Sequence, residues 1–259
     1  MRAARLVFWA MLSVASCSAF AQLSPVATYH LGESDPGAAP GASGAALTAD
    51  SSGAADLARI GIPTYSTFGS PASAIGMTFA GAEGYRNVAV VTSATDNFGM
   101  EAWVYATSAA GNAVIAYNGN TGTSGFGLFR NGGTYTYLFG GVAFGGAVPV
   151  ALNTWTHLAV VRDSGVTTLY VNGRANIVTG DAPNAAAGAM GVGINPVVMA
   201  EQFIGTIDEV RVFTFAPGTF QPAQLLLAVA RPVPTLQWQV QLLLALMLAA
   251  LAFRQIRRG

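Results

Sequence analysis

Few side chains in this chain of 259 residues could do chemistry, because it contains no lysine and a single cysteine, Cys17. Without lysine, the chain cannot form Schiff bases or build a phosphate-binding loop that depends on a lysine. Two histidines and twelve carboxylates remain as candidates for acid–base chemistry or metal binding. Their placement in the fold decides which of these the chain supports.

The two histidines give no sign of a catalytic site. His157 lies in the segment Trp-Thr-His-Leu-Ala-Val, whose alternation of side chains predicts a strand. Catalysis would require a hydroxyl nucleophile and an orienting carboxylate beside it, and no motif supplies them. We expect His157, and likewise His30 in the first strand, to be structural.

Two carboxylates that face each other across a sugar linkage would indicate a glycoside hydrolase. Asp208 and Glu209 are adjacent, so in a regular strand they point to opposite faces, and Glu101 is alone on its strand. The carboxylates therefore predict that the protein is not an enzyme, with a glycoside hydrolase as the least favoured alternative.

Aromatic side chains on the predicted strands could contact sugar rings, since they combine a broad apolar ring with a polar tip. Tyr135 and Tyr137 share one face of their strand, and Tyr117 and Trp155 are further candidates. The alternative is that these rings pack in the core or against neighbouring strands.

The elements that must position these side chains are strands. From 25 to 215, short apolar runs alternate with turns rich in Gly and Asn, and no helical stripe exceeds about two turns. Thr168–Val171, Asn172-Gly173 and the run from Arg174 read as a hairpin, because Asn-Gly supplies the positive φ angles of a two-residue turn. The pattern predicts an all-β sandwich of antiparallel strands.

Both ends of the chain read as targeting segments. Arg2 and Arg5, an apolar run and Ala19-Phe20-Ala21 predict a signal peptide over 1–21, with lipidation at Cys17 as the alternative. At the other end, an apolar run followed by three arginines predicts a membrane helix with a basic cytoplasmic tail over 236–259. Residues 22–228 form the predicted domain, and 229–235 form a linker and sorting box.

The domain between these ends is acidic. Residues 22–235, between the two targeting segments, keep 7 of the 12 arginines against all 12 carboxylates, a net charge of about −5. A surface of this sign has no electrostatic footprint for nucleic acid, so we expect no nucleic-acid partner.

Several short motifs, in order along the chain, resemble the laminin G-like, concanavalin A-type jelly-roll domains. They are Asp50-Ser51-Ser52-Gly53, FGMEAWV at 98–104, LNTWTHLAVV at 152–161, LYVNG at 169–173 and GTIDEVRVF at 205–213. The resemblance implies a two-sheet antiparallel jelly-roll sandwich with its first and last strands adjacent.

The same resemblance implies calcium as a cofactor, because in this family a cation often ties the opening segment to the closing Ile-Asp-Glu-Val strand. Carboxylates and loop carbonyls suit calcium, a hard cation with 6–8 oxygen ligands. We expect Asp208 as the first ligand and Asp50 as the second. The alternative is that Asp208 caps a turn by accepting backbone hydrogen bonds.

Residues 233–238 resemble an IPTL-type sorting signal of Gram-negative bacteria. Val233, Pro234, Thr235 and Leu236 fit its box, and Trp238 follows, but Gln237 stands where Ser-Glu is expected. The resemblance implies processing by an exosortase-like membrane enzyme.

Together these features predict an exported, membrane-tethered or sorted, non-catalytic binding module that recognises a glycan or a surface protein. It would be anchored in the inner membrane with its body outside the cytoplasm, or reach the cell surface after sorting. The alternative is a structural surface or matrix protein without a small ligand.

Overall fold

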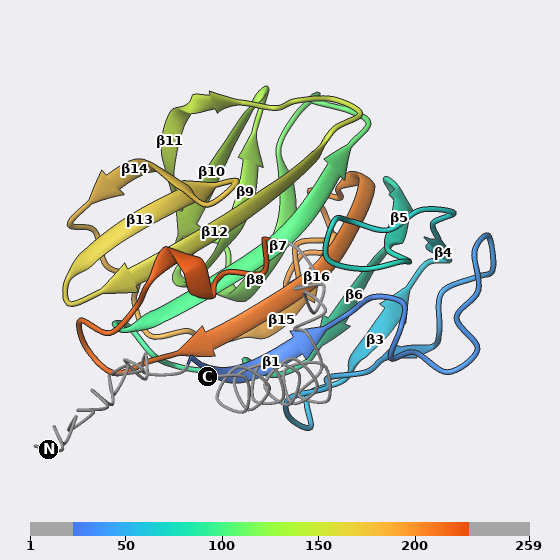
Figure 1. The fold of residues 1–259 in the computed structure, drawn as a ribbon, viewed down its shortest axis with the longest axis horizontal. Helices are drawn as coiled ribbons and strands as arrows, with labels where there is room; N and C mark the ends of the chain where they lie inside the picture. The colour runs from blue at the N-terminus through green and yellow to red at the C-terminus, as the bar shows by residue number, and fades with distance from the viewer. Residues whose placement is uncertain (1–22, 228–259) are drawn as a thin grey trace, which may run out of the picture.

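The computed structural model of the chain describes residues 23–227, which form two antiparallel β-sheets stacked face to face (Figure 1). Within this range the only helical element is one 3-10 turn, Pro222–Gln224. The all-β, two-sheet prediction is therefore confirmed. In the same range, no helix has the length and apolar character needed to cross a bilayer.

Sheet A has eight strands and carries most of the residues discussed below. Its order is β14 (Arg174–Thr179), β13 (Val166–Val171), β12 (Trp155–Asp163), β7 (Phe98–Ala106), β16 (Ile204–Thr214), β5 (Met77–Ala80) and β4 (Thr64–Tyr65), with β1 (Ser24–Tyr29) also paired to β16.

Sheet B also has eight strands and covers the other side of the core. Its order is β11 (Val142–Pro149), β10 (Thr134–Phe139), β9 (Ser124–Asn131), β8 (Ala113–Asn120), β15 (Ala189–Val192), β6 (Gly84–Asn87), β3 (Leu57–Ile60) and β2 (Leu47–Thr48).

Strand β16 is the junction of sheet A, because one edge pairs with β7 and the other edge is shared by two strands. Ile204 to Ile207 pair with β5, and Val210 to Thr214 pair with β1. The first and last strands are thus adjacent, as the sequence predicts (Figure 1).

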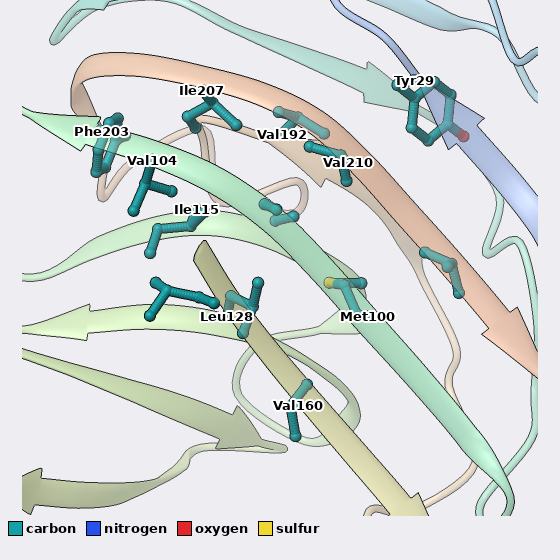
Figure 2. Close-up of a cluster of buried hydrophobic side chains, with 14 of the residues drawn as sticks. Tyr29, Met100, Val104, Ile115, Leu128, Val160, Val192, Phe203, Ile207 and Val210 are labelled. Atoms are coloured by element: carbon teal, nitrogen blue, oxygen red, sulfur yellow. The ribbon is translucent and has the colours of Figure 1, made fainter. Parts of the chain in front are cut away.

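The core lies between the sheets and follows the period-two alternation of the strands. Met100 and Val104 of β7, Val160 of β12 and Ile207 of β16 face Ile115, Leu128 and Val192 from sheet B (Figure 2). Each of these side chains is fully buried. Because the odd-numbered residues of β7 and β12 point the other way, Glu101, Trp103, Tyr105, Trp155 and His157 lie on the outer face of sheet A.

The predicted hairpin is confirmed between β13 and β14. Val171 pairs with Arg174, and the two turn residues Asn172 and Gly173 have φ angles of 49° and 75°. Asn and Gly tolerate this left-handed region, which explains why the chain reverses here.

Residues 215–227, which we call the C-terminal segment, fold back over the outer face of sheet A. Figure 1 draws this segment in orange-red across β12 and β7. Phe215, Phe220 and Leu225 pack on Val161 and Phe213 in a cluster separate from the main core. The Trp103 Nε1–H also donates to the Leu226 carbonyl at 2.7 Å. Sheet A is consequently buried on both faces beneath this segment.

The predicted signal peptide at 1–21, the sorting box and linker at 229–235 and the membrane helix at 236–259 lie outside the described residues. They remain predictions. The predicted domain at 22–228 spans the described range.

Candidate metal centre and adjoining aromatic surface

Three carboxylates from distant parts of the chain converge beside β16. Asp208 and Glu209 belong to the strand, whereas Glu33 lies in the loop after β1. One oxygen from each carboxylate lies within 4.8 Å of the others. We call Glu33, Asp208 and Glu209 the carboxylate cluster.

A β-bulge brings the two adjacent residues of the cluster together. On β7, Trp103 pairs with Asp208 and Glu101 pairs with Arg211, so Glu209 and Val210 together oppose a single residue. Glu209 has a φ angle of 50°, the left-handed value of a bulged residue. The prediction that Asp208 and Glu209 face opposite sides was wrong, because it assumed a regular strand.

Asp208 is the most constrained member of the cluster. It is fully buried, and its Oδ2 accepts hydrogen bonds from the Ser70 N–H, at 2.9 Å, and from the Ser73 hydroxyl. Its Oδ1 is buried without a hydrogen-bond partner among the described residues. Burial raises the pKa of Asp208 to about 7, against which the hydrogen bonds from Ser73 and Ser70 act.

Glu33 binds the backbone of the loop that contains Ser70 and Ser73, the two residues that donate to Asp208. Its Oε1 accepts the N–H groups of Ala74 and Ile75 at 2.6 and 2.9 Å. The loop between β4 and β5, residues 66–76, therefore crosses the cluster with both Glu33 and Asp208 bound to its backbone. We call it the cover loop.

Glu209 is paired with His30 at the end of β1. The His30 Nδ1–H contacts both Glu209 oxygens, at 2.9 and 3.0 Å, and His30 Nε2 lies 3.1 Å from the Ser51 hydroxyl. The hydrogen bond to Glu209 raises the pKa of His30 and outweighs the lowering effect of its burial. The opening segment is thus bonded to the closing strand through His30, whereas Glu33 is bonded to the cover loop.

The cluster fits a hard cation. It offers three carboxylates, one of which has a buried oxygen with no other partner, and oxygen ligands are those that calcium prefers. A cation held there would offset the repulsion between like charges and join the opening segment, the cover loop and β16. Its contribution would be structural, because Asp208 is closed off from solvent.

Asp50 has a different role from the one expected. Its Oδ1 accepts the backbone N–H groups of Thr28, Ser52 and Gly53, at 2.9 to 3.0 Å, and its Oδ2 accepts that of Ala55 at 3.3 Å. Asp50 thus caps its own Asp-Ser-Ser-Gly turn and ties it to β1. The structure places it outside the carboxylate cluster.

Sequence reasoning missed Glu33 and Glu209 as partners of Asp208. Glu33 lies in a loop without a motif, and nothing in the sequence reports its contact with residues 74 and 75. The bulge that turns Glu209 toward Asp208 also leaves no signature, since the non-glycine residue Glu209 occupies the left-handed position.

The three tyrosines expected to bind a ligand are all fully buried. Tyr135 and Tyr137 face the core of the sandwich, where the Tyr137 ring stacks on Phe144 with centroids 5.0 Å apart. Tyr117 lies on the outer face of sheet B, but its hydroxyl is held by Ser124 and Gly140. The ligand-binding prediction for these residues was wrong, because strand alternation and a covering turn take all three rings out of solvent.

Another set of aromatic rings does reach solvent, on the outer face of sheet A. Tyr105 and Trp155 are directly paired across β7 and β12, and Phe68 of the cover loop packs edge-on against both, at 5.1 and 5.9 Å. Phe68 is 42% exposed, and the other two rings are partly exposed. We call Phe68, Tyr105 and Trp155 the aromatic patch.

His157 does acquire a carboxylate partner, Glu101 on the neighbouring strand. His157 Nε2 lies 2.9 Å from Glu101 Oε2, and Arg211 binds the other Glu101 oxygen. Glu101 and His157 are fully buried, and the Leu226 N–H donates to Glu101 at 2.9 Å. This network anchors the C-terminal segment and is closed to substrate, which agrees with a structural role for His157.

The sequence of the chain matches a family model that agrees with the observed fold. Residues 80–218, more than half of the chain, match a laminin G-like family model described as the concanavalin A-like lectin/glucanases superfamily. The chain belongs to this family. Among curated proteins, none matches the sequence significantly.

Several solved structures share the fold at low sequence identity. Domain 4 of AbnA, a GH43 extracellular arabinanase from Geobacillus stearothermophilus in complex with arabinotriose, is 17% identical with a TM-score of 0.57, covering 80% of this chain and 97% of that chain. Trypanosoma rangeli sialidase in complex with the inhibitor DANA is 13% identical with a TM-score of 0.52 over 78% of this chain and 32% of its own. The botulinum neurotoxin serotype D binding domain is 12% identical with a TM-score of 0.50, over 74% and 48%.

Proposed function

We propose that this protein is an exported, non-catalytic module that binds glycans on the aromatic patch and whose cover loop is held in place by calcium. The observation that carries the proposal is the arrangement of Phe68, Tyr105 and Trp155, an exposed aromatic surface built on two strands and one loop.

The chemistry of the patch suits a sugar chain. Aromatic rings provide apolar area for the C–H faces of sugars, and the Trp155 indole and Tyr105 hydroxyl add polar edges. The acidic net charge of the domain favours neutral over acidic glycans. The arabinotriose-bound domain of the Geobacillus arabinanase supports a glycan as the ligand, since it has the same fold.

The proposed role of calcium is to hold the cover loop in place. This loop carries Phe68 to the patch, and its Ser70, Ser73, Ala74 and Ile75 are bound by Asp208 or Glu33. A cation on the carboxylate cluster would therefore fix the loop that completes the patch. Without the cation, repulsion among the carboxylates weakens these attachments.

The carboxylate cluster does not suit glycoside hydrolysis, even though its oxygens are close together. Hydrolysis needs two carboxylates on either side of a sugar linkage in an open cleft. Asp208 is fully buried and bound to the cover loop, and Glu209 is 7% exposed and paired with His30. A sugar could reach this pair only if the loop left its place.

The predicted targeting segments at the two ends of the sequence bear on where the protein is located. We propose that the signal peptide at 1–21 exports the domain and that the segment from 236 holds it at the membrane until sorting. Truncation after Arg231 should convert the protein from membrane-associated to soluble. If the truncated protein still pellets with carbonate-washed membranes, this segment is not the anchor and lipidation at Cys17 gains support.

The proposed function is tested by a glycan array probed with the purified protein in calcium and in chelator. We expect binding to neutral glycans that weakens at least tenfold in Trp155→Ala, and also weakens in chelator. Val166→Ala is the matched control, because Val166 is 47% exposed on the same sheet but outside the patch. Absence of binding to any glycan in either condition would favour the structural surface protein instead.

A further inference from the structure

The outer face of sheet B holds a pocket that the aromatic patch does not explain. Its volume is about 510 Å³, within the range of small-ligand sites, roughly 300–1,000 Å³. It lies above β9, β10 and β11, next to the loop between β15 and β16. The two sheets are stacked, so this pocket and the aromatic patch are on opposite faces of the molecule.

The floor of the pocket is apolar. Phe129 and Leu138 form it from the outward-facing positions of β9 and β10. Val198, which is 65% exposed, forms an apolar rim on the loop side. These carbon surfaces can contact the C–H face of a ligand.

One wall of the pocket is a rigid loop organised by Asn195. The Asn195 side-chain amide donates to Thr121 Oγ1 at 2.7 Å and to Glu201 Oε2 at 2.8 Å. Its carbonyl oxygen accepts the N–H groups of Val197 and Val198 at 3.1 and 3.3 Å. Since Asn195 is 3% exposed and fully engaged, the wall is formed before any ligand arrives.

The remaining polar groups of the pocket are free to bind. In the described part of the chain, the Asn131 amide and Glu201 Oε1 have no hydrogen-bond partner, and the Asn112 amide nitrogen also has none. Amides and carboxylates that converge on a small space are well suited to the hydroxyl groups of a polyol. They offer both donors and acceptors, as adjacent hydroxyls require.

The charge of the pocket narrows the class of ligand. Among the described residues that line it, Glu201 is the one charged side chain, and none of them is an arginine. A single carboxylate without a counter-ion repels acidic sugars and phosphates. The best match is a small, uncharged molecule with several hydroxyl groups and one apolar face.

We propose that this pocket, lined by Phe129, Leu138, Asn131, Val198 and Glu201, binds one neutral mono- or disaccharide unit. The site is independent of the aromatic patch, because it is built on the other sheet and shares no residue with it. A chain with a sugar site on each outer face can hold two glycan strands at once and gain avidity on a polymeric surface.

The test is calorimetric titration of the purified full-length protein with xylobiose, arabinobiose, cellobiose and lactose, and with glucuronic acid and glucosamine as charged comparisons. We expect at least one neutral disaccharide to bind and the acid to bind at least tenfold more weakly. Val198→Asp and Glu201→Gln should each weaken this binding at least tenfold. Val88→Asp is the matched control, because Val88 is 79% exposed and lies outside the pocket.

The results separate this site from the proposed function. If Trp155→Ala leaves disaccharide binding intact while Val198→Asp removes it, the pocket is a second site. If Val198→Asp behaves like Val88→Asp, or if none of the neutral probes binds, the pocket proposal is overturned, and glycan binding on the aromatic patch is judged by the array alone. Preference for glucosamine would overturn the assignment to neutral sugars.

Discussion

Asp208 and Glu209 are consecutive residues of β16, yet their carboxylates lie on the same side and within 4.8 Å of one another. The bulge opposite Ala102 causes this, and it falls where the partner of β16 changes from β5 to β1. The two carboxylates therefore meet Glu33 at the point where the opening segment joins the closing strand. A cation at this point would connect the parts of the chain that close sheet A.

Calcium should stabilise the wild-type protein, because a ligand that binds only the folded state raises its free energy of unfolding. The gain is about 2.7 kcal/mol when calcium is 100-fold above its dissociation constant. Thermal melts in millimolar calcium and in excess chelator measure it as a rise in midpoint, which Asp208→Asn should abolish. Asp50→Asn is the control: it should lower both midpoints through its lost turn hydrogen bonds and retain the calcium shift. Loss of the shift in Asp50→Asn alone would assign the ligand role to Asp50.

In chelator, the free energy of unfolding should fall as pH rises from about 4 to about 7. The folded-state pKa of Asp208 is about 7, above its ordinary value of 3.8, so the folded state holds its proton more tightly and loses this advantage as pH rises. The raised pKa of His30 acts in the same direction at the upper end, because protonated His30 favours the folded state. The effect is on the order of a few kcal/mol. Denaturant titrations across this pH range should show the decline in the free energy of unfolding, and Asp208→Asn should flatten the profile. A wild-type profile as flat as that of the variant would contradict the raised pKa of Asp208.

Glu101→Gln should be one of the most damaging single substitutions on sheet A. It removes the charge that pairs with Arg211, which is 12% exposed, and with His157, which is fully buried; breaking a buried pair of this kind typically costs about 3–5 kcal/mol. Urea denaturation measures the change in free energy. Asp181→Asn, an exposed carboxylate, should stay within about 0.5 kcal/mol of wild type. A similar small change in Glu101→Gln would show that the network does not hold the C-terminal segment.

Tyr137→Phe should affect stability and leave glycan binding unchanged. The hydroxyl is lost from its 2.7 Å contact with Thr179 Oγ1, which costs about 1 kcal/mol, whereas the ring keeps its stacking on Phe144. Melting and array binding of the same preparation test both parts. Lost glycan binding at an unchanged midpoint would return Tyr137 to the binding surface.

The sequence was sufficient to predict the fold because its strand and turn signals are local. Asn172-Gly173 specifies a hairpin through its own backbone preferences, and alternation along Trp155–Asp163 identifies a strand, although both faces of β12 are buried. Asp208 was also predicted as a candidate ligand. These features depend on residues that are close together in the chain.

The rest of the site depends on contacts that alternation does not encode. Tyr135 and Tyr137 do share a face, but the pattern does not say whether that face is the core or solvent. Phe68 reaches Tyr105 and Trp155 only because the cover loop is bound by Glu33 and Asp208. Such long-range arrangements depend on the tertiary structure and not on local sequence patterns.

A crystal structure of the protein grown in millimolar calcium tests the central claim most directly. We predict a cation coordinated by oxygens of Glu33, Asp208 and Glu209, with ligand distances of about 2.3–2.6 Å, and with Asp208 Oδ1 among the ligands. Cations found only elsewhere, or a carboxylate cluster that stays free of metal while Asp208 remains bound to Ser70 and Ser73, would contradict it.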